Sequence, residues 1–476
     1  MSVSPFVIVI AVALAPCAIV GCAVGPNYQR PDLDMPNKFH NTTPPEASTD
    51  PAGWWRSFGD PGLSQTVETA LAGNLDLVKA EARVREERAI ARAASAQLLP
   101  VGVLSASAAA EHQSLDGPTS KLASGLPGFQ RDQQLYDIGA GAAWDLDLFG
   151  GLRRERQAAG AMARASELER SAVAVAVAAD AADAYLQIRG LQARLSVAAA
   201  QERRATELVR LVDRLRTEGV ASEREANQAR AALEGVRAAA PTLRAALQAQ
   251  AARLAVLTGQ VPGDGQPLLE IATPVPTAPA PETANGPSSL LSRRADVAAA
   301  EARLAAANAR IGAAISDYYP KVSLSALLGS ESLSVGNLLT SQAFQPQAVA
   351  GLRWRLFDFG RVDAEVAGAK AREAEALADY RMTVLRAAGE VETAFSLLIE
   401  SRAEVAALNR QIAELTAARA RAQEAYSGGA VSLIEIIDAD RALLQASDQL
   451  AKAQTEGARA SVAAWRALGG GWRART

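Results

Sequence analysis

YDIGAGAAWDLDLFG at residues 136–150 and AVAGLRWRLFDFG at residues 348–360 end on related motifs, WDLDLFG and WRLFDFG, that lie 210 positions apart. In both stretches, apolar side chains alternate with polar or small ones. Tyr136, Ile138 and Trp144, for example, fall on one face of the first stretch. A period of two is typical of a β-strand between an apolar and a polar environment. The chain is therefore predicted to contain this kind of strand in each of two similar halves.

The repeat extends well beyond these strands. Glu81-Ala-Arg83 precedes Pro100 as Glu301-Ala-Arg303 precedes Pro320, and an alternating segment follows each proline. The Gly-Val-Ala-Ser run at 219–222 matches Gly-Ala-Val-Ser at 429–432. Self-similarity of this kind indicates a repeated structural unit. Each half is predicted to run helix, strand, loop, strand, long helix, break, helix.

The repeat sets the expected organisation of the chain. A signal peptide (1–21) is followed by an extended segment with an equatorial contact (22–70), the first repeat (71–259), a Pro/Gly-rich connector (260–287), the second repeat (288–470) and a tail (471–476). The expected strands are about 101–113, 134–148, 320–333 and 346–358, and the long helices about 151–216 and 361–427.

Both long helical segments lack proline and are rich in Ala, Arg, Glu and Leu. At a rise of 1.5 Å per residue, about 65 residues span on the order of 100 Å. Apolar residues recur every three or four positions, which favours coiled-coil packing. Pro241 interrupts the shorter 222–257 segment and is expected to bend or break it.

The composition excludes several functions. The formal net charge is −3, so no basic surplus is present to bind nucleic acid. The chain has two cysteines and two histidines, and neither type lies in a spacing expected of a nucleophile or a metal site. We therefore expect no enzyme, no metal and no other cofactor.

The N-terminus is predicted to be a targeting signal. Residues 6–20 are apolar and too short to span a membrane, which indicates a secretory signal, although residues 1–5 carry no Lys or Arg. Gly21-Cys22 resembles a bacterial lipobox, in which the cysteine is lipidated. Ala23 is not the Asp that retains lipoproteins at the inner membrane, so the outer membrane is favoured.

Four strands of this kind cannot form a membrane sheet alone, because unpaired backbone groups in lipid cost several kcal/mol each. Two copies would give an eight-stranded barrel filled by side chains. Three copies give twelve strands, the smallest cyclic assembly of this chain expected to leave a lumen. A soluble sheet with one face on a core is the alternative interpretation of the strands.

Several short motifs, in this order, point to a known family. They are Cys22-Ala-Val-Gly-Pro-Asn-Tyr-Gln-Arg-Pro31, Trp54-Trp-Arg-Ser-Phe-Gly-Asp60, Pro287-Ser-Ser-Leu-Leu-Ser-Arg-Arg294, and Tyr319-Pro320. Over nearly its whole length the chain resembles TolC-type outer-membrane efflux proteins, in the NodT-like lipoprotein subgroup. Ala295 departs from the family, which usually has proline after the arginine pair.

The resemblance implies an α+β membrane protein: a homotrimer with a twelve-stranded barrel, four strands per chain, continued by a long periplasmic α-helical barrel. It implies a periplasmic adaptor and an inner-membrane pump, usually of the resistance-nodulation-division class, as partners. The pump would supply the energy, and this chain would conduct drugs or other small molecules passively.

The resemblance also implies a periplasmic gate at the helix tip, carried by Glu435, Asp438, Tyr426 and Glu225. Glu435 and Asp438 lie three positions apart, so they share a helix face, and a trimer would present them as carboxylate rings. The alternative is that both are solvated first-turn residues favoured by the helix dipole. Val431 stands where some relatives have an arginine that forms a closing ion pair.

Four charged residues near the strand ends are candidates for the channel lining: Asp145, Asp147, Arg353 and Arg355. Ion pairs across neighbouring strands would explain them equally well.

Other functions remain open. The same tube could serve a type I protein or peptide secretion system, or metal-ion efflux, although four Met and two His argue against a soft-metal relay. A protein of a different class, a coiled-coil envelope lipoprotein without a channel, would not need the alternating strands.

Overall fold

The computed structural model describes residues 23–32, 38–41, 51–123, 125–263, 272–277, 279–281 and 293–472. The predicted signal peptide, Cys22 and most of the connector lie outside the described residues. The chain divides into two compact units, each built from both halves of the sequence. The sheet belongs to unit 1 (1–31, 85–164 and 301–378), and unit 2 comprises 32–84, 165–300 and 379–476.

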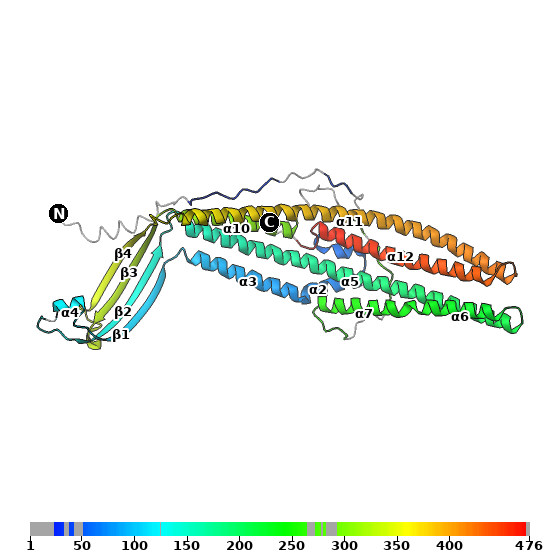
Figure 1. Ribbon diagram of the computed structural model, residues 1–476, viewed down its shortest axis with the longest axis horizontal. Helices are drawn as coiled ribbons and strands as arrows, with labels where there is room; N and C mark the ends of the chain where they lie inside the picture. The colour runs from blue at the N-terminus through cyan, green and yellow to red at the C-terminus, as the bar shows by residue number, and fades with distance from the viewer. Residues whose placement is uncertain are drawn as a thin grey trace. The chain divides into compact units, whose positions relative to one another are not determined.

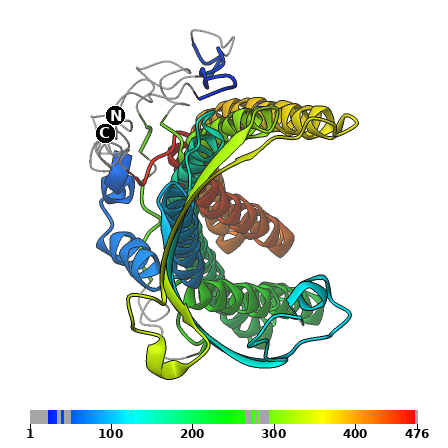
Figure 2. The same cartoon turned by 90° about the vertical axis from the view of Figure 1, so that its left-hand side faces the viewer.

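Unit 1 contains one curved, fully antiparallel sheet (Figures 1 and 2). Its strands are β1 (Val101–His112), β2 (Asp132–Asp145), β3 (Lys321–Ser332) and β4 (Phe344–Arg353), in the order β1-β2-β3-β4. The short helix α4 (Pro118–Ala123) and the 3-10 turn η3 (Val335–Asn337) lie in the two hairpin connections. Within the chain, β1 and β4 each keep one unpaired edge.

The two hairpins repeat each other residue by residue. Val101 pairs with Ala143 in the first, and Lys321 pairs with Arg353 in the second, so β3 matches β1 at a shift of 220 and β4 matches β2 at a shift of 210. The tryptophan Nε1 of each half donates to an equivalent carbonyl: Trp144 to Leu98 at 2.9 Å and Trp354 to Tyr318 at 3.0 Å. The sequence repeat is therefore also a structural repeat.

The second strand of each hairpin ends earlier than the alternation predicts, at Asp145 rather than 148 and at Arg353 rather than 358. The reason is local helix capping. Asp147 adopts a left-handed backbone (φ 43°), and its carboxylate accepts the backbone N–H groups of Leu152 and Arg153 at 2.8 and 2.9 Å. Asp358 accepts those of Gly360 and Val362. These side chains start the helices instead of extending the strands.

Two long helices of 67 residues each follow the hairpins: α5 (Gly151–Thr217) and α11 (Arg361–Ser427). The other helical elements are η2 (Pro51–Phe58), α2 (Pro61–Gly73), α3 (Leu75–Ala96), α6 (Glu223–Arg237), α7 (Ala239–Leu257), α10 (Ala295–Ser316) and α12 (Leu433–Ala467). The predicted break in the 222–257 segment is present, since α6 ends just before Pro241, which has no N–H to donate to the preceding turn.

Among the described helices, α5 alone is long and apolar enough to cross a membrane. More than half of its apolar window, 56%, is buried inside the protein. A core helix meets the same criterion, and the buried window of α5 packs in the core of unit 2.

The core of unit 2 is built mainly from η2, α2, α5 and α12, and α3 and α7 add Leu77, Leu247 and Leu254. Trp54 stacks on Trp465 with ring centroids 6.5 Å apart, and Leu63 and Val67 of α2 are fully buried beside them. The contribution of α5 is mainly alanine: Ala178, Ala179, Ala181, Ala182 and Ala184. Short side chains let these helices approach closely.

A tight contact between α5 and α12 provides a test of this packing. A Cβ at Gly190 would lie 2.2 Å from Oγ1 of Thr455, whereas Gly160 of the same helix has nothing within 4 Å. We expect Gly190→Ala to destabilise the fold by about 1–3 kcal/mol through overpacking, and Gly160→Ala to be neutral or stabilising. Adding Thr455→Ala to Gly190→Ala should recover most of the loss. Thermal unfolding of the three variants measures this, and equal melting temperatures for the two single variants would contradict it.

Candidate functional site

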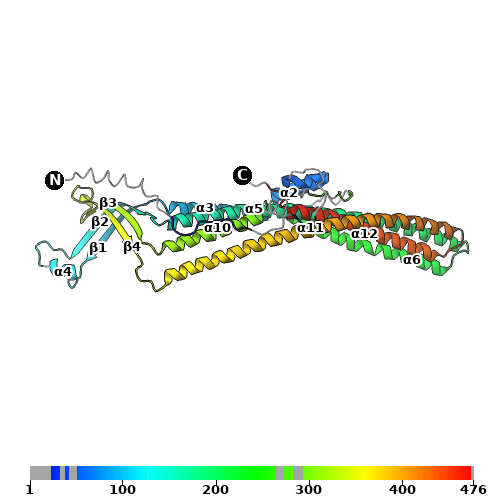
Figure 3. The same ribbon diagram turned by 90° about the horizontal axis from the view of Figure 1, so that it is seen from above.

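Two helix turns lie at the same end of unit 2, one joining α5 to α6 and one joining α11 to α12 (Figures 1 and 3). Each turn places a glycine in the left-handed region, Gly219 with φ 80° and Gly429 with φ 75°. The next residue closes each helix with an equivalent bond, Val220 N–H to Leu215 and Ala430 N–H to Ala425, both at 2.8 Å. Both predicted tips therefore have the same backbone geometry, which glycine permits at low cost.

One apolar cluster holds the two tips together. It contains Leu208 and Val212 of α5, Ala226 and Ala229 of α6, and Leu433, Ile436 and Ile437 of α12. Tyr426, at the end of α11, packs against the same cluster. The residues predicted for the gate therefore surround a shared core, although the two halves supply them separately.

Glu225 forms a capping box at the start of α6. Its carboxylate accepts the backbone N–H of Ser222 at 2.7 Å and the Ser222 hydroxyl at 2.8 Å, while the Ser222 hydroxyl accepts the N–H of Glu225. These bonds hold the pKa of Glu225 below its usual value of 4.5. At pH values above 4.5 the ionised carboxylate of Glu225 therefore stabilises the turn. This contribution is lost as the pH falls through the lowered pKa of Glu225.

Tyr426 lies within electrostatic range of Glu225. Burial raises the pKa of the Tyr426 hydroxyl, and the negative charge of Glu225 raises it further. These two predicted gate residues, one beside each helix turn, therefore lie near each other. The hydrogen bonds found in the described part of the chain include none between their side chains.

Glu435 and Asp438 lie on the first turns of α12, and both are exposed. Asp438 pairs with Arg441 Nη1 at 3.3 Å, and both side chains are more than half exposed. A surface pair of this kind contributes little to stability. Both carboxylates are therefore available to face a lumen or a partner.

Asp440, two residues further, is different. It is buried, and its Oδ1 accepts from Arg419 Nε of α11 at 3.1 Å. Asp448 of the same helix accepts both Nε and Nη2 of Arg194 on α5, at 2.7 and 3.0 Å. Bidentate pairs of this geometry are among the stronger ionic contacts. The Asp440–Arg419 pair ties α12 to α11, and the bidentate Asp448–Arg194 pair ties it to α5.

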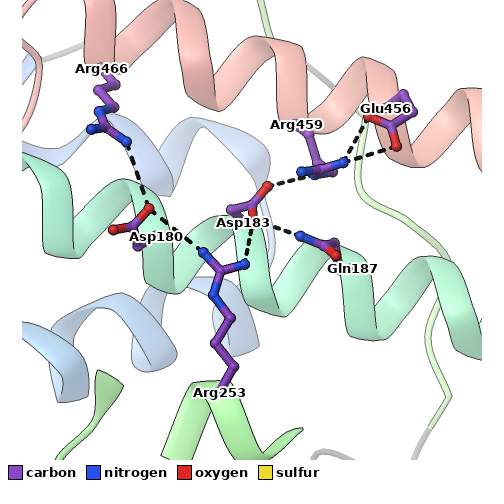
Figure 4. A network of polar contacts seen from close by, with 7 residues as sticks. All are labelled: Asp180, Asp183, Gln187, Arg253, Glu456, Arg459 and Arg466. Atoms are coloured by element: carbon purple, nitrogen blue, oxygen red, sulfur yellow. Dashed lines mark hydrogen bonds and ion pairs between the residues drawn. The ribbon is translucent and has the colours of Figure 1, made fainter. Parts of the chain in front are cut away.

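A larger ionic network anchors α12 further along (Figure 4). Asp183 of α5 accepts from Arg459 at 2.5 Å, from Arg253 at 3.1 Å and from Gln187 at 2.7 Å. The rest of the network adds Asp180, Glu456 and Arg466, so three acids meet three arginines. This network was not predicted from the sequence. Its members come from three distant segments, α5, α7 and α12, and no local motif signals them.

The four predicted lining residues have separate roles. Arg355 pairs with Asp317 at 3.7 Å and with Glu365 at 3.4 Å, whereas Asp147 caps α5 and pairs with Arg153. Arg353 lies opposite Lys321 in the sheet. Asp145 lies opposite Ser323. Asp145, Asp147 and Arg353 all line a cavity of about 580 Å³ in unit 1. Among the ion pairs in the described residues, none joins these two aspartates to these two arginines.

Residues 23–27 pack on the start of α5. Buried Arg154 donates to the Val24 carbonyl, the Gly25 carbonyl and Asn27 Oδ1, each at 3.0 Å. The Val24 N–H donates to the Phe149 carbonyl at 3.1 Å. Val24, two residues after the predicted lipidation site, is therefore held at the junction of β2 and α5.

Each half of the repeat supplies one hairpin of a curved sheet with exposed strand faces and one proline-free helix of 67 residues. A profile of the family "Outer membrane efflux protein" matches residues 66–260 and 286–470. The chain belongs to this family, and the predicted resemblance is confirmed.

Three relatives indicate how close the similarity is. The chain is 32% identical to the pyoverdine export outer membrane protein OpmQ of Pseudomonas putida over 406 residues, 84% of each chain. It is 28% identical to the probable outer membrane lipoprotein SilC of Salmonella typhimurium, over 89% of this chain and 90% of SilC. The solved structure of the outer-membrane channel OprN superimposes with a TM-score of 0.84 at 34% identity, covering 95% of this chain and 100% of that one.

These findings place the protein in the outer membrane with a periplasmic extension, as the outer-membrane channel component of an efflux system. They also settle the predicted class, since the alternative of an envelope spacer without a channel does not fit these relatives.

The unequal caps of the two tips lead to a matched prediction. The Ser222 side chain caps α6, whereas Ser432, its counterpart, makes no side-chain cap bond at α12. Ser222→Ala should cost about 1 kcal/mol of local stability, and Ser432→Ala should cost little. Hydrogen exchange of the first-turn amides of α6 and α12 measures both. Equal acceleration in the two variants would contradict the assignment.

Proposed function

We propose that three copies of this chain close a twelve-stranded barrel in the outer membrane and continue it as a helical tube into the periplasm. Each copy supplies four strands with two open edges. Open edges cannot persist in lipid, because their N–H and C=O groups have no water to bond. This constraint, together with the internal repeat, carries the proposal.

The repeat specifies how the copies join. Inside the chain, β2 pairs with β3, with Tyr136 opposite Ser332 and Trp144 opposite Leu324. The same contact between copies joins β4 to β1 of the next copy. β4 takes the place of β2 at a shift of 210, and β1 takes the place of β3 at a shift of 220. The contact between copies therefore places Leu352 opposite Ala106 and Trp354 opposite Leu104.

Exposed side chains support this junction. Phe149 stacks on Tyr319 within the chain, with ring centroids 4.6 Å apart. The equivalent residues of the proposed contact are Phe359, which is fully exposed, and Leu99, which is 64% exposed. In the trimer, Phe359 packs on Leu99 of the next copy and removes both from water.

The long helices also place a buried residue in the first half where the second half has an exposed counterpart. Val175 of α5 is buried, whereas its counterpart Leu385 of α11 is 67% exposed and lies near exposed Met382. On α3, Val78 and Ile90 are also about half exposed. We assign these apolar faces to the contact between α11 of one copy and α3 of the next.

In this assembly the channel conducts its cargo passively, and a periplasmic adaptor and an inner-membrane pump of the resistance-nodulation-division class drive the transport. Lipid on Cys22 anchors each copy. The contact of Ala23, which follows Cys22 in the chain, with Gly150 at the β2–α5 junction supports this proposal. Charged side chains at the periplasmic rim of the barrel, including Arg353, Arg355 and Asp145, line the lumen.

At the tip, threefold symmetry turns Glu435 and Asp438 into two carboxylate rings, with Tyr426 and Glu225 beside them. Rings of like charge repel each other and attract cations. Val431 removes one possible lock, so we assign closure to the contact of Tyr426 with the α5–α6 turn and to the ion pairs of Asp440 and Asp448.

The relatives and the composition of the chain bear on which cargo the channel conducts. One relative is named for pyoverdine export, and another, CusC of Escherichia coli, is a cation efflux system protein. This chain has four Met and two His, so a soft-metal relay along it is not favoured. We therefore propose organic small molecules as cargo, which a susceptibility panel on a deletion strain tests, with copper and silver salts as the metal arm.

The strand register gives a direct test of the trimer. A chain carrying Leu352→Cys and Ala106→Cys should form disulfides between copies in outer-membrane fractions, giving dimers and trimers and nothing larger on non-reducing gels. Directly opposed residues point to the same face of a sheet.

The matched control shifts the pair by one residue. Leu352→Cys with Ser105→Cys places the thiols on opposite faces and should cross-link far less. Equal cross-linking of both pairs would contradict the register, and ladders beyond three copies would contradict a closed trimer.

The gate has its own test. Replacing both Glu435 and Asp438 by Ala should leave the trimer assembled, increase single-channel conductance in planar bilayers and weaken block by multivalent cations, because the carboxylate rings that attract and hold cations are gone. Unchanged conductance and block would assign these residues to the solvated surface of α12.

A further inference from the structure

The segment that follows the predicted lipidation site, residues 23–31, lies on unit 1 as an extended strap. Near its start, Gly25 approaches α10 so closely that a Cβ on Gly25 would lie 2.4 Å from the Cα of Gly312. Near its end, Arg30 pairs with Glu301 of the same helix at 3.2 Å. Five extended residues span about 17 Å, and eleven helical residues span about 16 Å. The strap therefore runs along α10 with its backbone fully extended.

The strap supplies most of the hydrogen bonds of a buried arginine. Arg154, on the first turn of α5, is 4% exposed. Its Nε donates to the Val24 carbonyl, and its Nη2 donates to the Gly25 carbonyl and to Asn27 Oδ1, each at 3.0 Å. The fourth bond, from Nη1 to Gln157 Oε1 at 3.0 Å, stays within α5. The ion pairs found in the described part of the chain include the preceding arginine but not Arg154.

The strap and Arg154 therefore depend on each other. A buried charge is costly unless hydrogen bonds compensate it, and here three of the four acceptors belong to the strap. If the strap leaves, only the bond to Gln157 remains, and water has to enter the junction of β2 and α5 to hydrate the guanidinium. With the strap in place, the N–H of Val24 also donates to the carbonyl of Phe149, directly before α5, at 3.1 Å.

Two glycines make this close contact possible. Gly25 adopts a left-handed backbone with φ 87°, which glycine does at low cost. On the helix side, a Cβ at Gly312 would lie 2.7 Å from Arg154 Nε and 2.8 Å from the Val24 carbonyl oxygen. A side chain at either glycine would thus separate the strap from α10 and from Arg154.

We propose that residues 23–31 act as a strap that closes the β2–α5 junction, and that Arg154 is the positioning residue that holds the strap there. Docking of the strap excludes water from the junction and fixes the first turn of α5 beneath the sheet. The inference rests on the proposed function only for what the strap carries, because lipid on Cys22 acts on the junction through it. Docking itself is a property of a single chain and needs neither the lipid nor the trimer.

Hydrogen exchange on the full chain in detergent tests the strap. Gly25→Ala should speed exchange of the Val24 amide and of the first-turn amides of α5 by about tenfold or more, as expected when one or two hydrogen bonds are lost. Gly128→Ala is the matched control, because Gly128 is also left-handed (φ 94°) but has nothing within 4 Å of its Cβ position. It should leave both sets of amides unchanged. Asn27→Ala removes a single acceptor and should give a smaller acceleration.

A double-mutant cycle tests the role of Arg154. Arg154→Met and Gly25→Ala disrupt the same contact, so the double variant should exchange at the Val24 amide no faster than the faster single variant. Arg156→Met removes an exposed arginine of the same turn and should have little effect at this amide.

The strap is overturned if Gly128→Ala accelerates the Val24 amide as much as Gly25→Ala does. The role of Arg154 is overturned if the effects of Arg154→Met and Gly25→Ala multiply, or if Arg156→Met acts as Arg154→Met does. The mass of the N-terminal peptide from outer membranes tests the lipid separately. A peptide without lipid would contradict the proposed anchor and leave the result for the strap unaffected.

Discussion

The four-stranded sheet has two open edges, and most of the structure can be understood from that constraint. β1 and β4 leave a full strand's length of N–H and C=O groups unpaired within the chain. In lipid such groups must find partners in another strand, and all four strands of the described residues already belong to this sheet, so a second copy presents a matching one. The exposed side chains at the same junction, Phe359 and Leu99, follow from the same cause. The edges therefore connect the fold of one chain to the proposed assembly.

The internal repeat makes this possible with one gene product. Each half supplies one hairpin and one 67-residue helix, so a contact evolved between the halves can also serve between copies. The halves differ where their tasks differ. α12 is a single 35-residue helix, whereas its counterpart is broken between α6 and α7. Ion pairs at Asp440, Asp448 and Asp183 hold α12 along its length, which leaves its first turn free to carry the exposed carboxylates.

Local patterns and the repeat were enough to predict the strands, the long helices and the tips, because each has a short-range signal. The strands show a period of two, the long helices lack proline, and each tip has a glycine three residues before a serine. These patterns did not predict that Asp147 adopts a left-handed backbone and caps α5 instead of extending β2. They also failed where partners come from distant segments. Asp183 meets Arg253 and Arg459 only after three helices pack, and no spacing in the sequence indicates that. The buried Asp440, two residues from the predicted gate, was missed for the same reason.

The number of chains in the assembly distinguishes a closed barrel from a sheet with open edges. Native mass spectrometry of the detergent-solubilised protein, extracted from outer membranes, counts the copies without assuming a register. The account predicts a single species of three chains, because three sets of four strands close a barrel with a lumen. A stable monomer or dimer as the dominant species would contradict it, since either would leave the edges of β1 and β4 unpaired or the barrel filled.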